Sequence, residues 1–239
     1  MRLAIGRHTP KVPLVVLVLA AGTLATSALA FGALAAEASA AELTVNAGCY
    51  VIAGKNAPPM SFSGSGYTPG DQVLISSDEG TVDTSVKADS QGRISGRADA
   101  PTPFFATPGA QRIGLTAKDQ TPTGKTITAR TTVNVTELGW EHGSTKRQPG
   151  LRALTEKTNW SFSGFQPGKL IFGHYLYKGK QVALARFGRA QPPCGTLKVR
   201  ARLYPATPHH SSFSIQYDDS RAYSQKSRPR IIGPLKLTL

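Results

Sequence analysis

The sequence predicts an all-β protein with two tandem β-sandwich domains behind an N-terminal signal peptide. Three observations lead to this prediction. The chain of 239 residues is rich in Gly (24) and Pro (17), which favour turns over long helices. Its short apolar segments alternate apolar with polar residues, as half-buried strands do. A set of motifs also recurs once, which indicates an internal duplication.

The N-terminal segment has the layout of a secretory signal peptide. Basic residues up to Lys11 precede an uncharged apolar run over 12–36, and Ala38-Ser39-Ala40 offers small residues at a signal-peptidase site. We expect residues 1–40 to be removed, which leaves 41–239 as a secreted or cell-surface-associated protein. The apolar run is also long enough to span a bilayer, so an uncleaved membrane anchor is the alternative.

The duplication is visible in motifs that return in the same order. Ser61-Phe62-Ser63-Gly64 recurs as Ser161-Phe162-Ser163-Gly164, and Pro69-Gly70 recurs as Pro167-Gly168, each time before an apolar run. Three further segments match at offsets of 100 to 103 residues. Chance does not readily produce several matches in one order at nearly one offset, so we infer two copies of one domain.

Each copy reads as a set of short strands separated by Gly and Pro turns. The segments TTVNVT and SFSIQY show the alternation clearly, and no segment of the mature chain has a convincing helical period. About seven short strands in about 100 residues indicate an immunoglobulin-like sandwich. We predict domains over 41–137 and 151–239, joined by a polar, breaker-rich linker over 138–150.

In the first copy, the segments GSGYTPGDQV, ADSQGRISG and QRIGLTAKD carry a resemblance to known modules. They are similar to the immunoglobulin-like sandwiches of secreted bacterial proteins, including the neocarzinostatin-like fold. The second copy, with GHYLYKGK and PPCGTLKVR, matches only loosely. Neocarzinostatin-like proteins carry disulfides within the domain, whereas each copy here has one Cys. The resemblance therefore implies the fold and no enediyne-binding role.

The two cysteines, Cys49 and Cys194, fall one in each copy. Lone cysteines of an extracellular chain tend to pair, and this bond would join the two domains. Two buried thiols or an intermolecular bond are the alternatives, because the sequence does not show that the two Cα atoms approach within bonding range. We predict a Cys49–Cys194 disulfide.

Positive charge is concentrated in the second copy and the segment before it. Residues 41–137 contain eight Lys or Arg and nine Asp or Glu, whereas 138–239 contain seventeen and four. The whole chain has a formal net charge of +14. A charge balance of this kind favours anionic partners without choosing among them.

Part of this charge is ordered by the alternation of a strand. Between Leu197 and Leu203, cations alternate with apolar residues, and alternate residues of a strand share one face about 7 Å apart. The sequence match puts Ser95, Arg97 and Asp99 at the equivalent positions of the first copy, so the fold does not require cations there. A charged face that confers solubility and protects a sheet edge is the alternative. The residues predicted to bind an anionic partner are Lys198, Arg200, Arg202 and Arg186.

The sequence contains no recognisable catalytic motif, neither a Gly-x-Ser-x-Gly elbow nor a His-Glu-x-x-His, a phosphate loop or a Cys-x-x-Cys. We expect no catalytic residue and no cofactor. The adjacent His209 and His210 have no Cys or Glu nearby to complete a metal site, so we expect no metal. His174 lies within an apolar strand and is expected to be a buried or edge histidine.

Together these features predict a secreted, non-catalytic binding module. Its basic second domain would contact an anionic polysaccharide, a cell-wall polymer or a membrane surface, without obligate oligomerisation. Nucleic acid is the least favoured partner, because no exposed aromatic residues interleave with the cations for base stacking. The alternatives are a structural or adhesion spacer and a small-molecule carrier with a cleft between sheets or domains.

Overall fold

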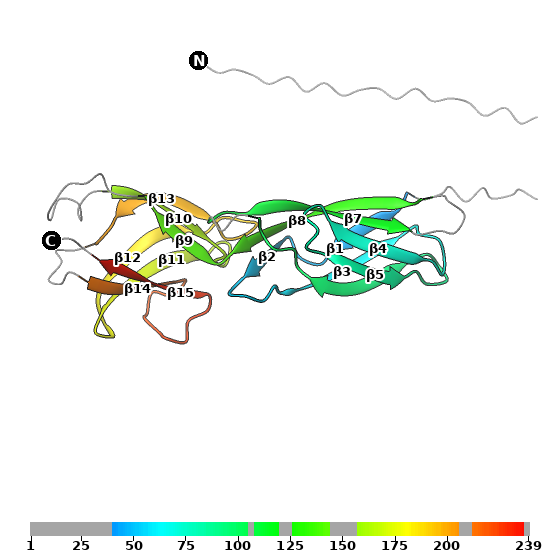
Figure 1. The fold of residues 1–239 in the computed structure, drawn as a ribbon. Coiled ribbons are helices and arrows are strands. Elements are labelled where there is room, and N and C mark those ends of the chain that lie inside the picture. Colours follow the sequence, from blue (N-terminus) through cyan, green and yellow to red (C-terminus); the bar gives the residue numbers. More distant parts are fainter. Residues whose placement is uncertain (1–39, 105–107, 120–125, 144–156, 206–211, 237–239) are drawn as a thin grey trace, which may run out of the picture. The chain divides into compact units, whose positions relative to one another are not determined.

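The computed structural model describes residues 40–104, 108–119, 126–143, 157–205 and 212–236 (Figure 1). The predicted signal peptide lies outside these residues, except for Ala40. All regular elements in the described ranges are β-strands. These ranges contain no helix that is long and apolar enough to cross a membrane.

The first copy folds into two sheets. The three-stranded sheet has the order β1-β3-β6, from β1 (Glu42–Val45), β3 (Pro59–Ser65) and β6 (Ile94–Asp99). The five-stranded sheet has the order β2-β8-β7-β4-β5, from β2 (Cys49–Ile52), β4 (Gln72–Ser77), β5 (Asp83–Lys87), β7 (Gln111–Asp119) and β8 (Thr128–Glu137). Strand β2 pairs with β8 in parallel, and the other pairings are antiparallel.

The second copy also folds into two sheets, and both are antiparallel. The three-stranded sheet has the order β13-β10-β9, from β9 (Gly139–His142), β10 (Lys157–Ser163) and β13 (Leu197–Arg202). The four-stranded sheet has the order β12-β11-β14-β15, from β11 (Leu170–Tyr177), β12 (Lys180–Arg189), β14 (Ser212–Asp218) and β15 (Arg230–Lys236). The chain is therefore an all-β protein with two tandem immunoglobulin-like sandwiches.

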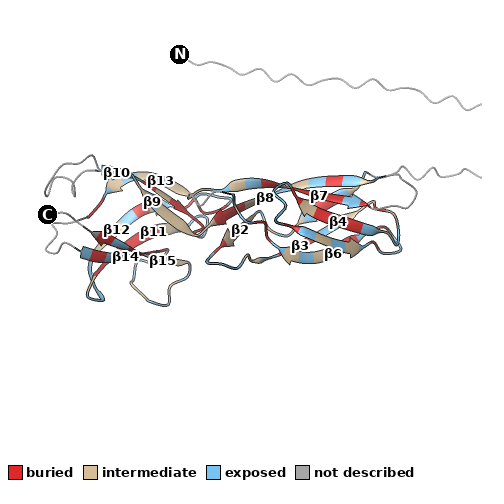
Figure 2. Ribbon diagram, in the orientation of Figure 1, coloured by how far each residue is buried: buried red, intermediate tan, exposed pale blue. Residues whose placement is uncertain are grey.

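Each sandwich has a hydrophobic core of its own. Period-2 alternation sends one face of each strand inward, and Figure 2 shows buried and exposed positions alternating along several strands. The first core is mainly aliphatic around Ile75 and Leu115. The second is aromatic, with the Trp160 and Phe187 ring centroids 4.9 Å apart. Large aromatic side chains bury much apolar area each, which suits a domain of this small size.

One loop contact repeats in both sandwiches. The amide of Tyr67 donates to the carbonyl of Gly92 at 3.1 Å, and the amide of Phe165 donates to that of Gly195 at 3.3 Å. Both glycines have a positive φ, 70° and 64°. A Cβ would lie 2.2 Å from the Tyr67 carbonyl oxygen at Gly92, and 1.5 Å from the Phe165 carbonyl oxygen at Gly195. Both positions therefore require glycine.

The segment predicted as a linker, 138–150, begins with a strand. Only Leu138 separates β8 from β9, and β9 pairs with β10 from Gly139 to His142. The physical reason is local: Trp140 packs into the second core, with its ring centroid 4.9 Å from that of Tyr217. Polar neighbours mask this short strand in the sequence. The rest of the predicted linker, from residue 144, lies outside the described residues.

Two hydrogen bonds accompany this short connection. The Ser163 hydroxyl donates to the carbonyl of Glu137 at 2.7 Å, and the amide of Leu138 donates to the carbonyl of Ile52 at 2.9 Å. Residue 164 is a glycine with φ 80°, and a Cβ there would lie 2.8 Å from the Leu138 Cα. The chain therefore passes from β8 to β9 through a tightly packed residue.

Candidate functional site

Three of the four predicted anion-binding residues lie on one face of strand β13. Lys198, Arg200 and Arg202 are all exposed, while the alternate residues Leu197, Val199 and Ala201 pack against the second core. The alternation seen in the sequence is therefore the alternation of a sheet face. It turns all three cations away from the core.

The neighbouring strand β10 adds a cation that the sequence analysis did not single out. Antiparallel register places Lys157 opposite Arg202, Asn159 opposite Arg200 and Ser161 opposite Lys198. Residues opposite each other in a sheet point to the same side, so Lys157 belongs to this surface. The residues Lys157, Lys198, Arg200 and Arg202 are called the basic face below.

Few acidic groups among the described residues lie near the basic face. The described residues form two ion pairs, Arg93–Asp89 and His174–Asp218, and neither includes a residue of this face. One Arg200 guanidinium nitrogen reaches the Lys157 backbone carbonyl at 3.5 Å, which satisfies a donor without cancelling charge. The one acidic residue in these three strands, Glu141 on β9, lies opposite Ser161 and is therefore one strand removed from Lys198.

The equivalent face of the first sandwich has a balanced charge. In the first sandwich Gly64 lies opposite Ile94, and in the second Phe162 lies opposite Leu197. Ile94 and Leu197 each lie two residues after the glycine of the shared loop contact, so the two strand pairs correspond from that contact onward. The structural equivalents of Lys198, Arg200 and Arg202 are therefore Ser95, Arg97 and Asp99, as in the sequence match.

The fourth predicted residue, Arg186, is not part of the basic face. It lies on β12 in the four-stranded sheet, opposite Phe172 of β11. The next residue, Phe187, points into the core, so Arg186 points to the outer face of the sheet. There it lines a groove of about 350 Å³ on the outer face of the sheet. This arginine groove is formed by Leu170, Phe172, Leu184, Arg186 and Arg221.

Beside the arginine groove lies a buried polar cluster centred on His174. The side chains of His174, Gln216 and Asp218 are fully buried, as the apolar strand around His174 predicts for that residue. His174 Nε2 lies 3.1 Å from Asp218 Oδ1 and 3.0 Å from the Ser220 carbonyl oxygen. His174 Nδ1 lies 3.0 Å from Gln181 Oε1. Both ring nitrogens thus face acceptors, which suits a protonated imidazolium.

The pKa shifts of this pair follow from its contacts. Burial alone lowers the pKa of His174, but the hydrogen bonds with Asp218 and Gln181 raise it above 6.5 overall. Burial alone raises the pKa of Asp218, but hydrogen bonds from His174, Gln216 and the Ser220 amide lower it below 3.8 overall. The pair is buried beneath the loop between β14 and β15 and holds the Ser220 backbone of that loop through hydrogen bonds.

The two cysteines form a disulfide. Cys49, at the start of β2, and Cys194, in the loop before β13, have Cα atoms 5.4 Å apart and close a sequence separation of 145 residues. The bond joins the pair that the sequence predicts. It connects an element of the first sandwich with an element of the second, in addition to the main-chain path through Leu138.

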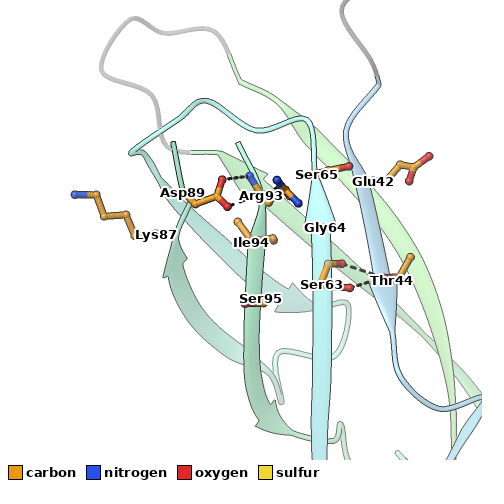
Figure 3. Close-up of a pocket in the computed structure, with 10 residues that line it drawn as sticks. All are labelled: Glu42, Thr44, Ser63, Gly64, Ser65, Lys87, Asp89, Arg93, Ile94 and Ser95. Atoms are coloured by element: carbon orange, nitrogen blue, oxygen red, sulfur yellow. Dashed lines mark hydrogen bonds and ion pairs between the residues drawn. The ribbon is translucent and has the colours of Figure 1, made fainter. Parts of the chain in front are cut away.

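The first sandwich has a polar surface groove of about 540 Å³ across β1, β3 and β6 (Figure 3). The Thr44 and Ser63 hydroxyls lie 2.9 Å apart in it, and Asp89 pairs with Arg93 at 3.9 Å. Two backbone amides donate to Asp89 and lower its pKa below 3.8. The charged groups lining this groove are two acids and two cations, so it favours neither sign of ligand.

No group of His, Cys, Asp or Glu that could hold a metal ion occurs in the part of the chain that the structure describes. The adjacent His209 and His210 lie outside the described residues. Sequence reasoning missed Lys157 and Arg221. The alternation of KTNWSFS places Lys157 on the outer face, but only the register with β13 brings it to the basic face. Nothing in the sequence signals the position of Arg221.

Comparisons with known proteins give distant likenesses only. No protein-family model and no curated protein sequence matches the chain. A tetra-tandem repeat from the extending region of a large adhesion protein matches with a TM-score of 0.29 at 12% identity, over 82% of this chain and 49% of that one. A Ca²⁺-stabilised adhesin that helps an Antarctic bacterium bind ice matches with a TM-score of 0.30 at 15% identity, over 84% and 49%.

The chain thus spans about half the length of these two structures. A third match, the E. coli chaperone DraB, has a TM-score of 0.26 at 10% identity, over 82% of this chain and 97% of that one. Scores this low carry no argument about function. The description of the chain as tandem sandwiches follows from its own strands and cores.

Proposed function

We propose that this protein is a secreted, non-catalytic binding module whose second domain attaches to an anionic polymer of the cell surface through the basic face. The observation that carries the proposal is the group of four exposed cations on β10 and β13, none of which is in an ion pair among the described residues. The function rests on their common face and not on the net charge of the chain.

The geometry of the basic face suits an extended polyanion. Cations on one strand repeat about every 7 Å, and the two strands lie about 4.8 Å apart. Neighbouring charges lie within about 8 Å of each other, the Debye length at physiological ionic strength, so adjacent cations act on a ligand together. Neither the polar groove of the first sandwich nor the groove beside Arg186 is lined by these four residues, and a row of cations on a sheet face suits a linear polymer better than a small molecule.

The comparison within the chain supports a specific role for these cations. The structurally equivalent positions in the first sandwich hold Ser95, Arg97 and Asp99, whose charges cancel. The same fold is thus built without a cationic face. The Cys49–Cys194 disulfide supports the extracellular location, because disulfides persist in oxidising compartments.

A spacer or adhesion role is the second candidate, and a separate observation favours it. The two sandwiches are connected twice, through Leu138 in the main chain and through the Cys49–Cys194 disulfide. A double connection would resist extension between the domains. This role and attachment through the basic face are compatible, but only attachment requires the cations.

Salt dependence tests the proposed function most simply. The mature protein is applied to a column of immobilised anionic cell-wall polymer and, separately, to a column of a neutral polysaccharide. Retention on the anionic column should disappear as salt rises from about 0.01 M to about 1 M, because the Debye length falls from about 30 Å to about 3 Å. Retention that does not change with salt, or that is equal on the neutral column, would contradict attachment through the basic face.

A further inference from the structure

We infer that the arginine groove binds a small amphiphile with an apolar segment and a carboxylate, at a site separate from the basic face. The groove combines two features, an apolar floor and two arginines. A ligand that satisfies both must itself have an apolar part and an anionic part.

The floor of the groove is formed by strands β11 and β12. Leu170 and Phe172, two residues apart on β11, both lie on its outer face. Leu184 lies beside them on β12, opposite His174. Phe172 is buried, while Leu170 and Leu184 are half-buried. Water would contact this apolar surface in the absence of a ligand, and its removal from water would favour binding by about 25 cal/mol per Å².

The two arginines of the groove are available to a ligand. Arg186 and Arg221 are exposed, and neither is in an ion pair among the described residues. Asp218 lies opposite Phe172, but its carboxylate is already bound by His174, Gln216 and the Ser220 amide. The Asp218 carboxylate thus cannot neutralise the arginines without breaking the buried cluster.

The buried cluster also holds the chain next to Arg221. The Ser220 amide donates to Asp218 Oδ1 at 3.0 Å, and the Ser220 carbonyl lies 3.0 Å from His174 Nε2. Arg221 follows directly, so its backbone starts from a residue that is fixed on both its amide and its carbonyl. An arginine whose backbone is positioned in this way loses less conformational freedom when it binds a carboxylate.

The size of the groove limits the ligand. A volume of about 350 Å³ lies near the lower end of the range of about 300–1,000 Å³ that is usual for ligand sites. A medium-chain carboxylate such as octanoate has a suitable size, an apolar chain for the floor and a head that arginine can bind through two hydrogen bonds. The chemical class, and not octanoate itself, is the inference.

Titrations of the full mature protein with octanoate, followed by ¹H–¹⁵N NMR shifts, test the inference. Saturable shifts should concentrate at residues 170–172, 184–186 and 220–222, with a dissociation constant on the order of 1 mM or below. Octanol, which lacks the charge, and acetate, which lacks the chain, should bind at least about tenfold more weakly. The lost charge-assisted hydrogen bonds justify this factor for octanol, and the lost burial of the apolar chain justifies it for acetate.

Matched variants assign the binding to the two arginines. Arg186→Gln and Arg221→Gln should each weaken octanoate binding about tenfold. Arg200→Gln, which changes an exposed arginine of the basic face, should leave octanoate binding unchanged and weaken retention on an anionic polymer. The spectra themselves show whether each variant is folded.

Three results would overturn the inference. Wild-type protein could give no saturable shifts around the groove, octanol could bind as well as octanoate, or Arg200→Gln could weaken octanoate binding as much as the groove variants do. The last result would indicate general attraction of anions to a cationic domain. None of these outcomes bears on the retention of polymers by the basic face, which is measured separately.

Discussion

Lys157 and Arg202 lie directly opposite each other on β10 and β13, and both side chains are exposed. Opposite residues in an antiparallel pair have Cβ atoms about 4.5–5.5 Å apart, and like charges at that distance destabilise the sheet. This pair therefore opposes the folding of the second sandwich. We therefore attribute the presence of these two cations to binding and not to folding.

The first prediction concerns the energetic cost of this pair. Lys157→Gln should raise the free energy of unfolding by about 0.2–1 kcal/mol, because it removes repulsion across the strands. The gain, measured by urea denaturation, should shrink as salt rises. Lys87→Gln is the matched control, since Lys87 is exposed on a strand opposite the uncharged Gln72. Equal effects of the two substitutions would show that the opposed cations do not repel measurably.

The second prediction concerns the repeated loop contact. Gly92→Ala and Gly195→Ala should each lower the free energy of unfolding by more than about 1–3 kcal/mol, because both combine a positive φ with a clash against a backbone carbonyl. Gly195→Ala should be the more damaging, since its Cβ would lie closer to that carbonyl. Gly109→Ala is the control, because a Cβ there meets nothing within 4 Å. A tolerated alanine at either loop position would contradict the packing described here.

The third prediction is a pH dependence from the buried pair. His174 has a raised pKa in the folded protein, so its stabilisation is complete below about 6.5 and is lost as pH rises through the folded value. Asp218 has a lowered pKa, so its stabilisation is present above 3.8 and is lost as pH falls through the folded value. The free energy of unfolding should therefore fall both above neutrality and in acid.

Urea denaturation over a pH series measures this dependence. Four charged or polar groups face His174 or its ring: Asp218 from β14, Gln181 from β12, and Ser220 and Tyr223 from the covering loop. In His174→Gln the free energy of unfolding should no longer fall above pH 6.5. It should also be lower than that of the wild type at every pH. If the free energy of unfolding of the wild type rises between pH 6.5 and 8.5, and this rise is absent from His174→Gln, the pKa of His174 is lowered and not raised by folding.

The fourth prediction concerns the disulfide. Replacement of Cys49 and Cys194 together by Ser should lower the free energy of unfolding by about 2–4 kcal/mol, the usual contribution of a native disulfide. Because each sandwich has its own core, the far-ultraviolet circular dichroism should stay that of a β protein. The intact mass of the unreduced protein should be two protons below that of the reduced form. A random-coil spectrum of the double variant would contradict the claim that each sandwich has a core sufficient for folding without the disulfide.

The fold could be predicted from the sequence because its causes are local. Alternation in TTVNVT buries Val133 and Val135, and the Gly of each repeat occupies a loop position that requires a positive φ. The strand β9 escaped prediction because only Leu138 and Trp140 are apolar within a polar stretch. Its burial depends on packing with residues far away in the sequence.

The candidate site could be predicted only in part. Alternation alone places Lys198, Arg200 and Arg202 on one face. The addition of Lys157 depends on the β10–β13 register, and the separation of Arg186 depends on which sheet contains β12. A sequence shows which residues share a strand face, but not which strand lies beside it.

The most direct test of attachment through the basic face is a charge reversal with a control of equal charge. Lys198→Glu, Arg200→Glu and Arg202→Glu are combined in one variant, and Lys55→Glu, Lys87→Glu and Arg97→Glu, three exposed cations of the first sandwich, in another. Both variants change the net charge equally, and exposed substitutions usually alter stability by no more than about 0.5 kcal/mol each. Retention on immobilised anionic cell-wall polymer at low salt is the measurement. If the basic face binds the polymer, the first variant is not retained and the second is retained nearly as well as the wild type. Equal retention of the two variants would contradict attachment through the basic face.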